Sequence, residues 1–554
     1  MHVSLVALNA KYIHKNLAIR YLKQTCPSQH TCTLYEFTTK DDLNKIVDTV
    51  LKDQPDMIGI STYIWNIESV KTLTTLFKEK APHVYIHLGG PEVSFEQDFF
   101  LNTLPIDAIC CGEGEFTLWQ YMDALENKEV NIDIPGIFTR SSRPTLSYAI
   151  TPLQKLEQYP SPYFMEMDME HMDTRYLYVE TSRGCPYQCT YCLSSVQGNV
   201  RLFSLDYVKD VLDNIFASSA RQIKFLDRTF NVDRQRALFI AKYIHENARV
   251  EQVFQFEIAA EFLSEELITF LETRKGGPKF RFEVGIQTTN EDALVAIKRR
   301  QNFTKLSNVV QRILKGENCE IHGDLIAGLP MEGYESFTRS FNDVFHIYPT
   351  ELQLGFLKLL RGTYMKENSN AYEMIYQEEA PYEILETKWI SREELERIRD
   401  VAYALENLYN KGRMRTTILT VLDRYSITPF DLFLYLGSDL RSNKPKNYYE
   451  LFTRVYTLLG NKFGHENVIG LLNEEYYALS KQKVKRIAEF EVEDKSALLE
   501  VLVENHVAVI NDLIHYGVFA LGAEGILFVL YNKNQEYPKL YRIIDRNVIE
   551  LERK

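Results

Sequence analysis

The chain has 554 residues and a formal net charge of −13, and 45% of its residues are hydrophobic and 25% charged. This is the composition of a folded globular protein of roughly three or four domains, and its acidic balance argues against general DNA binding. The first residues lack the basic start of a signal peptide, and residues 518–531 are too few to span a bilayer. The eight cysteines do not show the repeated spacing of a disulfide framework in secreted proteins. We therefore expect a cytoplasmic protein with no membrane partner.

Residues 1–145 alternate short apolar runs with amphipathic helical patterns. This alternation favours a doubly wound α/β domain of the flavodoxin-like or Rossmann type, whose parallel sheet binds ligands at the carboxyl ends of its strands. The expected strands cover residues 3–8, 32–37, 57–61, 84–88 and 107–110.

Glycine turns and polar side chains follow three of these strands. Glycine lets the backbone approach a ligand closely, although each turn also has the simple alternative of leading a strand into its helix. The candidate ligand-binding residues at this edge are Ser61, Thr62, Tyr63, Trp65, Gly89, Gly90, Glu92, Gly112, Glu113, Gly114 and Glu115.

The G-G-P-E and G-E-G-E turns within this set resemble those of the cobalamin-binding domain family. The resemblance implies that cobalamin (vitamin B12) binds at this edge, and a bare or nucleotide-binding flavodoxin-like domain is the alternative. No histidine follows an aspartate by two residues, so the D-x-H-x-x-G motif of histidine-ligated domains is absent. By resemblance, cobalt then lacks a protein imidazole on its lower face, and we expect Tyr63 or Trp65 to cover that face.

Four prolines in and beside residues 146–164 predict an extended linker. Residues 165–375 then repeat strand and helix six times. A (βα)6 unit is too short for a closed eightfold barrel. The expected strands cover residues 177–181, 222–227, 253–258, 280–287, 320–327 and 351–358.

Cys185, Cys189 and Cys192 follow the first of these strands with C-x3-C-x2-C spacing. Three thiolates in one short loop converge on a soft metal centre. A structural zinc needs a fourth cysteine or histidine, and a [4Fe–4S] cluster normally takes four thiolates. With three, one iron stays open to another ligand. An open cluster is the preferred reading, and zinc or inert core thiols are the alternatives.

The same spacing, with Tyr191 before the last cysteine, resembles the signature of the radical S-adenosylmethionine (SAM) superfamily. The resemblance implies a [4Fe–4S] cluster whose open iron chelates SAM, and reductive cleavage of SAM to a 5′-deoxyadenosyl radical. It also implies a partial TIM barrel open to substrate, and an electron donor such as flavodoxin or ferredoxin. Polar residues near the strand ends are candidates for the SAM or substrate pocket, with a structural ion pair as the alternative for each. They are Asp227, Asn231, Glu257, Glu283 and Gln287.

Residues 380–554 predict a mostly α-helical domain that ends in a hairpin or small sheet turning at Asn532, Lys533 and Asn534. This part resembles the uncharacterised extension of a subset of cobalamin-type radical SAM proteins. The leading hypothesis is methylation of an unactivated carbon through methylcobalamin, on a small molecule, peptide or RNA. The alternatives are a rearrangement, a reduction, a tRNA-base modification, or a non-catalytic cobalamin-binding or electron-transfer protein.

Overall fold

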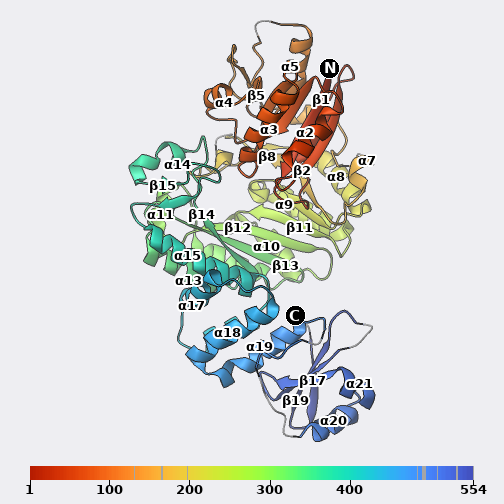
Figure 1. Ribbon diagram of the computed structural model, residues 1–554, viewed down its shortest axis with the longest axis vertical. Helices are drawn as coiled ribbons and strands as arrows, with labels where there is room; N and C mark the ends of the chain where they lie inside the picture. Colours follow the sequence, from red (N-terminus) through yellow and green to blue (C-terminus); the bar gives the residue numbers. More distant parts are fainter. Residues whose placement is uncertain are drawn as a thin grey trace. The chain divides into compact units, whose positions relative to one another are not determined.

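The computed structural model describes residues 1–129, 132–163, 166–195, 198–482, 484–488, 494–507, 509–531 and 535–552. The chain forms two compact units, coloured from red to blue along the sequence in Figure 1. The first contains Met1–Phe337 and Gly355–Ser391, and the second contains Thr338–Leu354 and Arg392–Lys554. Within the described ranges, no helix has both the length and the apolar composition needed to cross a membrane.

The first unit begins with a six-stranded sheet in the order β2-β1-β3-β4-β5-β6. Its first five strands are parallel, which confirms the predicted doubly wound sheet. The sixth pairs antiparallel with β5 and was not predicted. The strands are β1 (His2–Asn9), β2 (Thr31–Thr38), β3 (Met57–Ser61), β4 (Tyr85–Gly89), β5 (Ala108–Cys110) and β6 (Ile137–Thr139).

Helices cover both faces of this sheet, and each face has its own hydrophobic core. Val70, Leu73 and Phe77 of α3 are fully buried in one core, and each such side chain contributes about 1.5–3 kcal/mol by leaving water. Helices α2 (Leu43–Leu51), α3 (Ile67–Lys80) and α4 (Gln97–Thr103) pack on that face, and α1 (Leu17–Gln24) and α5 (Thr117–Glu126) on the other.

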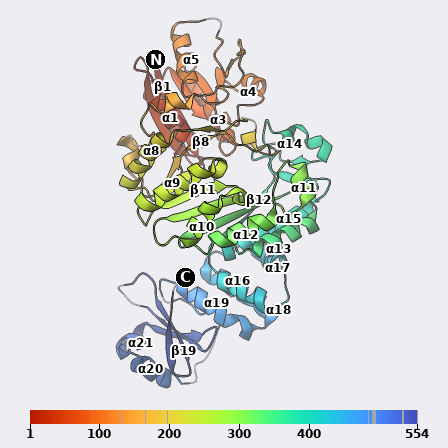
Figure 2. The same cartoon turned by 180° about the vertical axis from the view of Figure 1, so that it is seen from behind.

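A second sheet runs in strict sequence order, β14-β13-β12-β11-β10-β7, and does not close in the part of the chain that the structure describes. It is the partial barrel expected from six βα repeats. Its strands are β7 (Tyr176–Val179), β10 (Gln222–Phe225), β11 (Val253–Ile258), β12 (Lys279–Gln287), β13 (Cys319–Ala327) and β14 (Glu351–Phe356). Figure 2 shows this sheet from behind with its helices, which include α8 (Leu205–Ala217), α9 (Arg234–Asn247), α10 (Glu265–Thr273), α11 (Glu291–Ala296), α12 (Phe303–Ile313) and α13 (Tyr334–Phe345).

The segment predicted as a linker, residues 146–164, packs on the first sheet in part. It contains the one-turn helix α6 (Leu153–Leu156), and Ala149 forms an isolated β-bridge with Gly112. The domain boundaries drawn from the sequence stay predictions.

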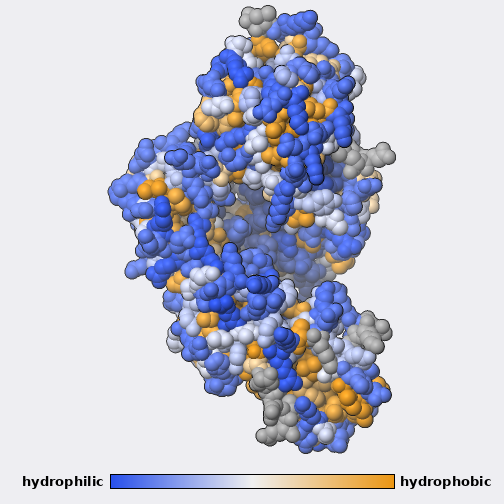
Figure 3. Space-filling model, in the orientation of Figure 1, coloured by the Kyte–Doolittle hydropathy of each residue, from blue (hydrophilic) through white to orange (hydrophobic). Residues whose placement is uncertain are grey.

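The second unit is mostly helical, as predicted, and ends in a four-stranded antiparallel sheet. The predicted turn at residues 532–534 lies outside the described residues. Hydrophobic residues gather in Figure 3 over the part that carries this sheet and α21. The helices are α15 (Arg392–Ala404), α16 (Arg415–Arg424), α17 (Pro429–Ser442), α18 (Tyr448–Phe463), α19 (His465–Leu479), α20 (Lys495–Glu504) and α21 (Ile510–Tyr516), and the strands are β17 (Gly517–Leu521), β18 (Ile526–Leu530), β19 (Lys539–Ile544) and β20 (Asn547–Leu551).

Candidate functional site

The three cysteines lie on the loop that follows β7 and the two-residue strand β8 (Ser182–Arg183). All three are free thiols; Cys189 is buried, and Cys185 and Cys192 are half-buried. Gly184 has a φ of 94°, and a Cβ there would lie 2.6 Å from the Asn199 carbonyl oxygen, so this turn requires glycine. The loop therefore presents its thiols from a tightly held backbone.

Polar groups on neighbouring segments approach two of the sulfur atoms. The Oγ1 atom of Thr229 lies 3.8 Å from Cys185 Sγ, and Nη1 of Arg299 donates to Cys189 Sγ at 3.9 Å. Burial raises the pKa of Cys189 and the other two thiols add to that effect, whereas Arg299 lowers it. Three free thiols on one short loop, with Arg299 donating to the sulfur of Cys189, are a donor set that fits an iron–sulfur cluster. Tyr191 is half-buried beside this group, and burial raises its pKa.

Asp227 holds the segment that leads into the cysteine loop. Its carboxylate accepts hydrogen bonds from Thr181 N at 2.9 Å, Thr181 Oγ1 at 2.6 Å and Ser182 Oγ at 2.6 Å. Asn231 joins two strand ends, because its amide both donates to and accepts from the backbone of Ala259. The observed contacts of both residues position the backbone, and their predicted role near SAM stays a prediction.

Arg183, two residues before Cys185, connects this loop to the first sheet. Its Nη2 lies 2.7 Å from Glu115 and 3.0 Å from Glu180, and its Nη1 lies 3.2 Å from Glu113. Its guanidinium also stacks 5.3 Å above the ring of Tyr21. Three carboxylates around one buried cation form a strong, directional junction.

The two glutamates of the G-E-G-E turn thus have protein partners. Glu113 also pairs with Arg201, and Glu115 accepts a hydrogen bond from Thr151 Oγ1 at 2.7 Å. Burial opposes the ionisation of Glu115, but Arg183 and Thr151 outweigh it and hold the pKa of this carboxyl below its usual range. The turn expected at cobalamin is therefore tied to the segment that carries the cysteines.

A second junction is formed by Glu92 of the G-G-P-E turn. Its carboxylate lies 3.3 Å from Arg361 Nε and accepts a hydrogen bond from Tyr382 OH. Gly362 has a φ of 77°, and a Cβ there would lie 2.2 Å from the Phe95 ring. Glu92 is only 4% exposed, and these contacts give it a structural role at the boundary with the partial barrel.

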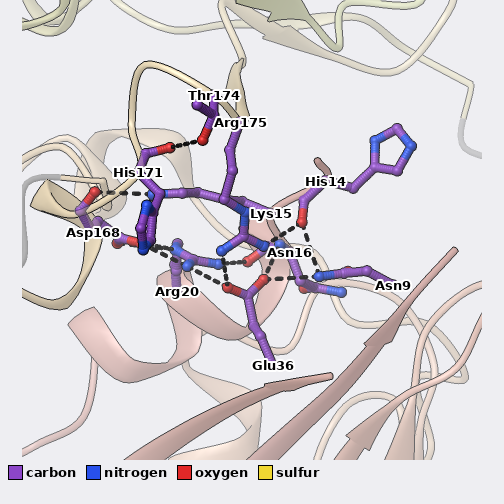
Figure 4. Close-up of polar contacts among 10 residues, drawn as sticks. All are labelled: Asn9, His14, Lys15, Asn16, Arg20, Glu36, Asp168, His171, Thr174 and Arg175. Atoms are coloured by element: carbon purple, nitrogen blue, oxygen red, sulfur yellow. Dashed lines mark hydrogen bonds and ion pairs between the residues drawn. The ribbon is translucent and has the colours of Figure 1, made fainter. Parts of the chain in front are cut away.

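Figure 4 shows a third, largely buried ion network at the carboxyl ends of β1 and β2. Asp168, on helix α7 (Glu166–Met169), lies 3.0 Å from Lys15 Nζ and 2.6 Å from Arg20 Nη2. Arg20 also pairs with Glu36 at 2.6 Å, and Arg175 lies 3.6 Å from the same carboxylate. Each charge has an opposite partner, so this network fixes α7 onto the first sheet.

Between these junctions, the first sheet presents an aromatic platform. Tyr63 and Trp65 follow β3 and stack with ring centres 4.3 Å apart and planes 7° apart. Trp65 donates through Nε1 to the Leu8 carbonyl oxygen at 3.2 Å and is 48% exposed. A Cβ on Gly90, whose φ is 119°, would lie 2.4 Å from the Thr62 carbonyl oxygen. The flat ring and the close glycine turn fit a large planar ligand.

The other residues predicted at this edge are placed where the sequence indicated, at the carboxyl ends of three adjacent parallel strands. Ser61 Oγ accepts a hydrogen bond from Asn16 Nδ2 at 3.1 Å, and the others line the turns themselves. They are Ser61 and Thr62 after β3, Gly89 and Gly90 after β4, and Gly112 and Gly114 after β5.

Glu257, Glu283 and Gln287 lie on the inner face or at the end of the partial barrel. Glu283 is in the middle of β12 and pairs with Lys224 at 3.2 Å, the ion-pair alternative named from the sequence. Glu257 is half-buried near the end of β11, and burial raises its pKa. Gln287 ends β12 with a φ of 68°.

Sequence reasoning missed Arg183, although it lies two residues before the first cysteine of the motif. It also missed Arg299, which no local pattern marks.

Comparison with known families agrees with this architecture. Residues 3–120 match the B12 binding domain, residues 179–344 match the Radical SAM superfamily, and residues 370–512 match a protein of unknown function, DUF4080.

The similar curated proteins and solved structures agree with these family matches. An uncharacterized methyltransferase, PH0819 of Pyrococcus horikoshii, is 28% identical over 234 residues, which are 41% of this chain and 51% of that protein. The cobalamin-dependent radical SAM methyltransferase TokK of Streptomyces tokunonensis is 28% identical over 304 residues, 51% of this chain and 44% of TokK. The chain thus spans about half the length of these relatives. The structure of the cobalamin-dependent SAM radical enzyme OxsB with aqua-cobalamin is similar in fold, with a TM-score of 0.60 at 18% identity over 86% of this chain and 80% of OxsB.

The matched domains define a chain in which a B12-binding domain is followed by a radical SAM domain. More particularly, this one joins a B12-binding domain and a radical SAM domain to a C-terminal DUF4080 domain. These domains imply a [4Fe–4S] cluster, SAM and cobalamin as cofactors.

Proposed function

We propose that the protein cleaves SAM reductively at a cluster held by Cys185, Cys189 and Cys192, and methylates an unactivated carbon with a methyl group carried by cobalamin. The observation that carries this proposal is the Arg183 junction. It ties the G-E-G-E turn to the segment two residues before Cys185, and so supports one reaction site for both cofactors. When bound, the cluster supplies an electron to SAM and cobalamin supplies a methyl group.

The chain's own residues orient these groups and exclude water. Arg299 donates to the sulfur of Cys189, which stabilises the added negative charge of the reduced state. Trp65, stacked on Tyr63 and exposed, would pack against bound cobalamin and hold water away from it. The inner face of the partial barrel then receives the substrate at the carboxyl ends of its strands, where ligands bind in such folds.

An external one-electron donor of the flavodoxin or ferredoxin type is the partner that this proposal requires. The sequence has no second closely spaced set of thiolates that would hold a relay cluster. The names of PH0819 and TokK, both methyltransferases, support transfer of a methyl group as the outcome.

The experiment is an anaerobic reaction of the reconstituted protein with SAM, a reductant and a cell extract, followed by mass spectrometry of small molecules, peptides and RNA. With SAM deuterated on its methyl group, we expect 5′-deoxyadenosine together with a product that carries the label. Cys189→Ala is expected to abolish 5′-deoxyadenosine formation and still bind cobalamin, whereas Cys319→Ala, a distant half-buried thiol, keeps both. SAM cleavage that persists in Cys189→Ala would refute the proposed site.

A second outcome, rearrangement or reduction without methyl transfer, has support from the printed name of OxsB, a radical enzyme that is not called a methyltransferase. It predicts 5′-deoxyadenosine with an unlabelled product in the same reaction.

A further inference from the structure

A group of cations in the second unit forms no ion pair, although the chain as a whole carries a net charge of −13. Other basic side chains of this unit do pair with carboxylates, as Arg441 does with Asp400 at 2.9 Å. Within the described ranges, the cations without a carboxylate partner include Arg413, Lys444, Lys446 and Lys485. Cations that protein carboxylates leave unpaired give a surface a local positive potential, which attracts anions.

Three of these cations meet at the start of α18. Lys444 and Lys446 are exposed in residues 443–447, the loop that leads into the helix. Arg413 lies in the turn before α16, and its guanidinium carbon is 5.0 Å from the centre of the ring of Tyr448, the first residue of α18. The turn before α16 and the loop before α18 therefore place positive charge at one end of the same helix.

The fourth cation, Lys485, comes from the segment that follows α19. Helices α18 and α19 pack side by side (Figures 1 and 2), and Tyr476 of α19 donates through its hydroxyl to the Lys485 carbonyl oxygen at 3.0 Å. This contact fixes the segment against α19. The exposed Lys485 Nζ then lies 5.8 Å from the centre of the Tyr449 ring, again in the first turn of α18.

Tyr448 and Tyr449 place aromatic rings among these cations. Tyr448 is 46% exposed, and Tyr449 is half-buried. A guanidinium or ammonium group over the face of a ring is attracted by its π electrons, so Arg413 and Lys485 help to hold the rings in place. The exposed part of Tyr448 offers a flat apolar surface to a planar group of a ligand.

The carboxylate nearest in sequence, Glu450, is engaged in capping the helix. Its Oε2 accepts a hydrogen bond from Lys446 N at 2.8 Å, and Asn447 Oδ1 accepts one from Glu450 N at 3.0 Å. The dipole of α18 adds partial positive charge at this end. The surface therefore keeps an excess of positive charge. This basic–aromatic surface consists of Arg413, Lys444, Lys446, Tyr448, Tyr449 and Lys485.

We propose that the basic–aromatic surface binds a single-stranded nucleic acid. The lysine and arginine side chains would contact phosphates, and an unpaired base would stack on Tyr448, the combination by which single strands are bound. The acidic balance of the whole chain argues against general binding of duplex DNA, but it does not cancel a local surface of opposite sign. The inference goes beyond the proposed function and does not depend on it, because the surface lies wholly in the second unit.

A duplex and an acidic protein fit this surface less well than a single strand. The bases of a duplex stack on one another and present only their edges in the grooves, so they offer no face to the ring of Tyr448. The carboxylates of an acidic protein would satisfy the lysines and leave that ring facing water.

The test uses the full chain reconstituted with cluster and cobalamin. Fluorescence anisotropy measures the binding of a labelled single-stranded RNA of about 12 nucleotides, a length within the range of single-strand sites. The same sequence is titrated as single-stranded DNA and as an RNA duplex, and polyglutamate of equal length represents an acidic protein. We expect the better single strand to bind at least about fivefold more tightly than the duplex and polyglutamate. Tighter binding of RNA than of DNA, or the reverse, supports the proposal and identifies the natural strand.

The affinity for the single strand should fall as salt is added, with a log–log slope of about −0.7 for each cation that neutralises a phosphate. Lys444→Ala combined with Lys446→Ala should weaken binding and make this slope less steep by about 1.4. Lys462→Ala, an exposed lysine near the other end of α18, is the matched control and should leave both unchanged.

Tyr448→Ala should reduce the affinity at least about fivefold because one stacked base is lost, whereas Tyr448→Phe keeps the ring and should retain the affinity. Tyr348→Ala, which removes a tyrosine that is 52% exposed in the same unit, is the aromatic control and should have no effect. Binding that is equally tight for the duplex, or that is unchanged in Tyr448→Ala, would overturn the proposal. Polyglutamate that binds as tightly as the single strands would overturn it in favour of an acidic protein partner.

Discussion

Nη2 of Arg183 lies 2.7 Å from Oε1 of Glu115, and this pair joins the cysteine loop to the fifth strand of the first sheet. The same guanidinium also pairs with Glu113 and Glu180. Because Arg183 lies two residues before Cys185, these pairs help to set the position of the cysteine loop relative to the first sheet. Arg201 adds to them through its contacts with Glu113 and the Thr151 carbonyl oxygen.

Replacement of Arg183 should destabilise the first unit. Arg183→Met leaves Glu115 and Glu180 without a cation and Glu113 with Arg201 alone, and breaking a buried ion pair in this way costs about 3–5 kcal/mol. Arg183→Lys keeps the charge but loses the planar fork, so we expect a smaller loss. Chemical denaturation measures both variants. Arg312→Met, which breaks a surface ion pair, is the control and should have a much smaller effect; equal losses would contradict this role for Arg183.

Trp65→Ala should weaken cobalamin binding. The exposed ring covers apolar surface of the ligand, and loss of one large side-chain contact is worth about 1.5–3 kcal/mol, or roughly tenfold or more in affinity. Equilibrium dialysis and the visible spectrum of the bound cofactor report the change. Phe239→Ala, another partly exposed aromatic residue on α9, should have no effect, and unchanged affinity in Trp65→Ala would exclude the aromatic platform as part of the site.

Arg299→Gln should make the cluster harder to reduce. The guanidinium donates to Cys189 Sγ, and removal of a nearby positive charge disfavours the reduced, more negative state. We expect a shift to more negative potential on the order of 60 mV, which is tenfold in a one-electron equilibrium. A redox titration followed by electron paramagnetic resonance measures it. Arg300→Gln, exposed and adjacent in sequence, is the control; a shift of the same size in that variant would rule out a specific contact.

Asp324→Asn should raise thermal stability more at pH 8 than at pH 5. The folded protein keeps a proton on Asp324 up to a pKa of about 7 because of burial and the facing charges of Glu283 and Glu257, against which Lys224 and Arg299 act. An unfolded aspartate ionises near pH 4. The folded state therefore loses stability as pH rises between these values, and asparagine removes that loss.

The expected difference in the stability gain between the two pH values is roughly 2–3 kcal/mol, which corresponds to a difference of several degrees in Tm. Differential scanning fluorimetry measures it, with Asp210→Asn on the exposed side of α8 as the matched control. A gain that is the same at both pH values would show that Asp324 does not titrate in this range.

Much of the fold was predictable because buried parallel strands have a strong local signal. The predicted strand at residues 3–8 became β1 (His2–Asn9), and the one at 57–61 matched β3 (Met57–Ser61). Strand β6 escaped prediction, and its antiparallel pairing with β5 depends on where the chain returns to the edge of the sheet. The cysteine spacing indicated a metal centre because its ligands are neighbours in the chain.

The roles of the acidic residues at the sheet edge were not predictable in the same way. Glu92 was expected at cobalamin, and its partner Arg361 lies 269 residues away in sequence. Glu283 was expected in the SAM or substrate pocket, and its Lys224 partner lies on another strand. An ion pair depends on which strands become neighbours, and periodicity in one segment contains no information about the side chains of another.

The sequence alone determined the domain order, the two α/β sheets and the incomplete thiolate set, because apolar periodicity and ligand spacing act between residues close in the chain. Only the tertiary structure decided that Arg183 ties the G-E-G-E turn to the cysteine loop, and that Lys224 of β10 pairs with Glu283 of β12. These are questions of charge pairing and burial, and both depend on distances that exist only once the sheets have formed.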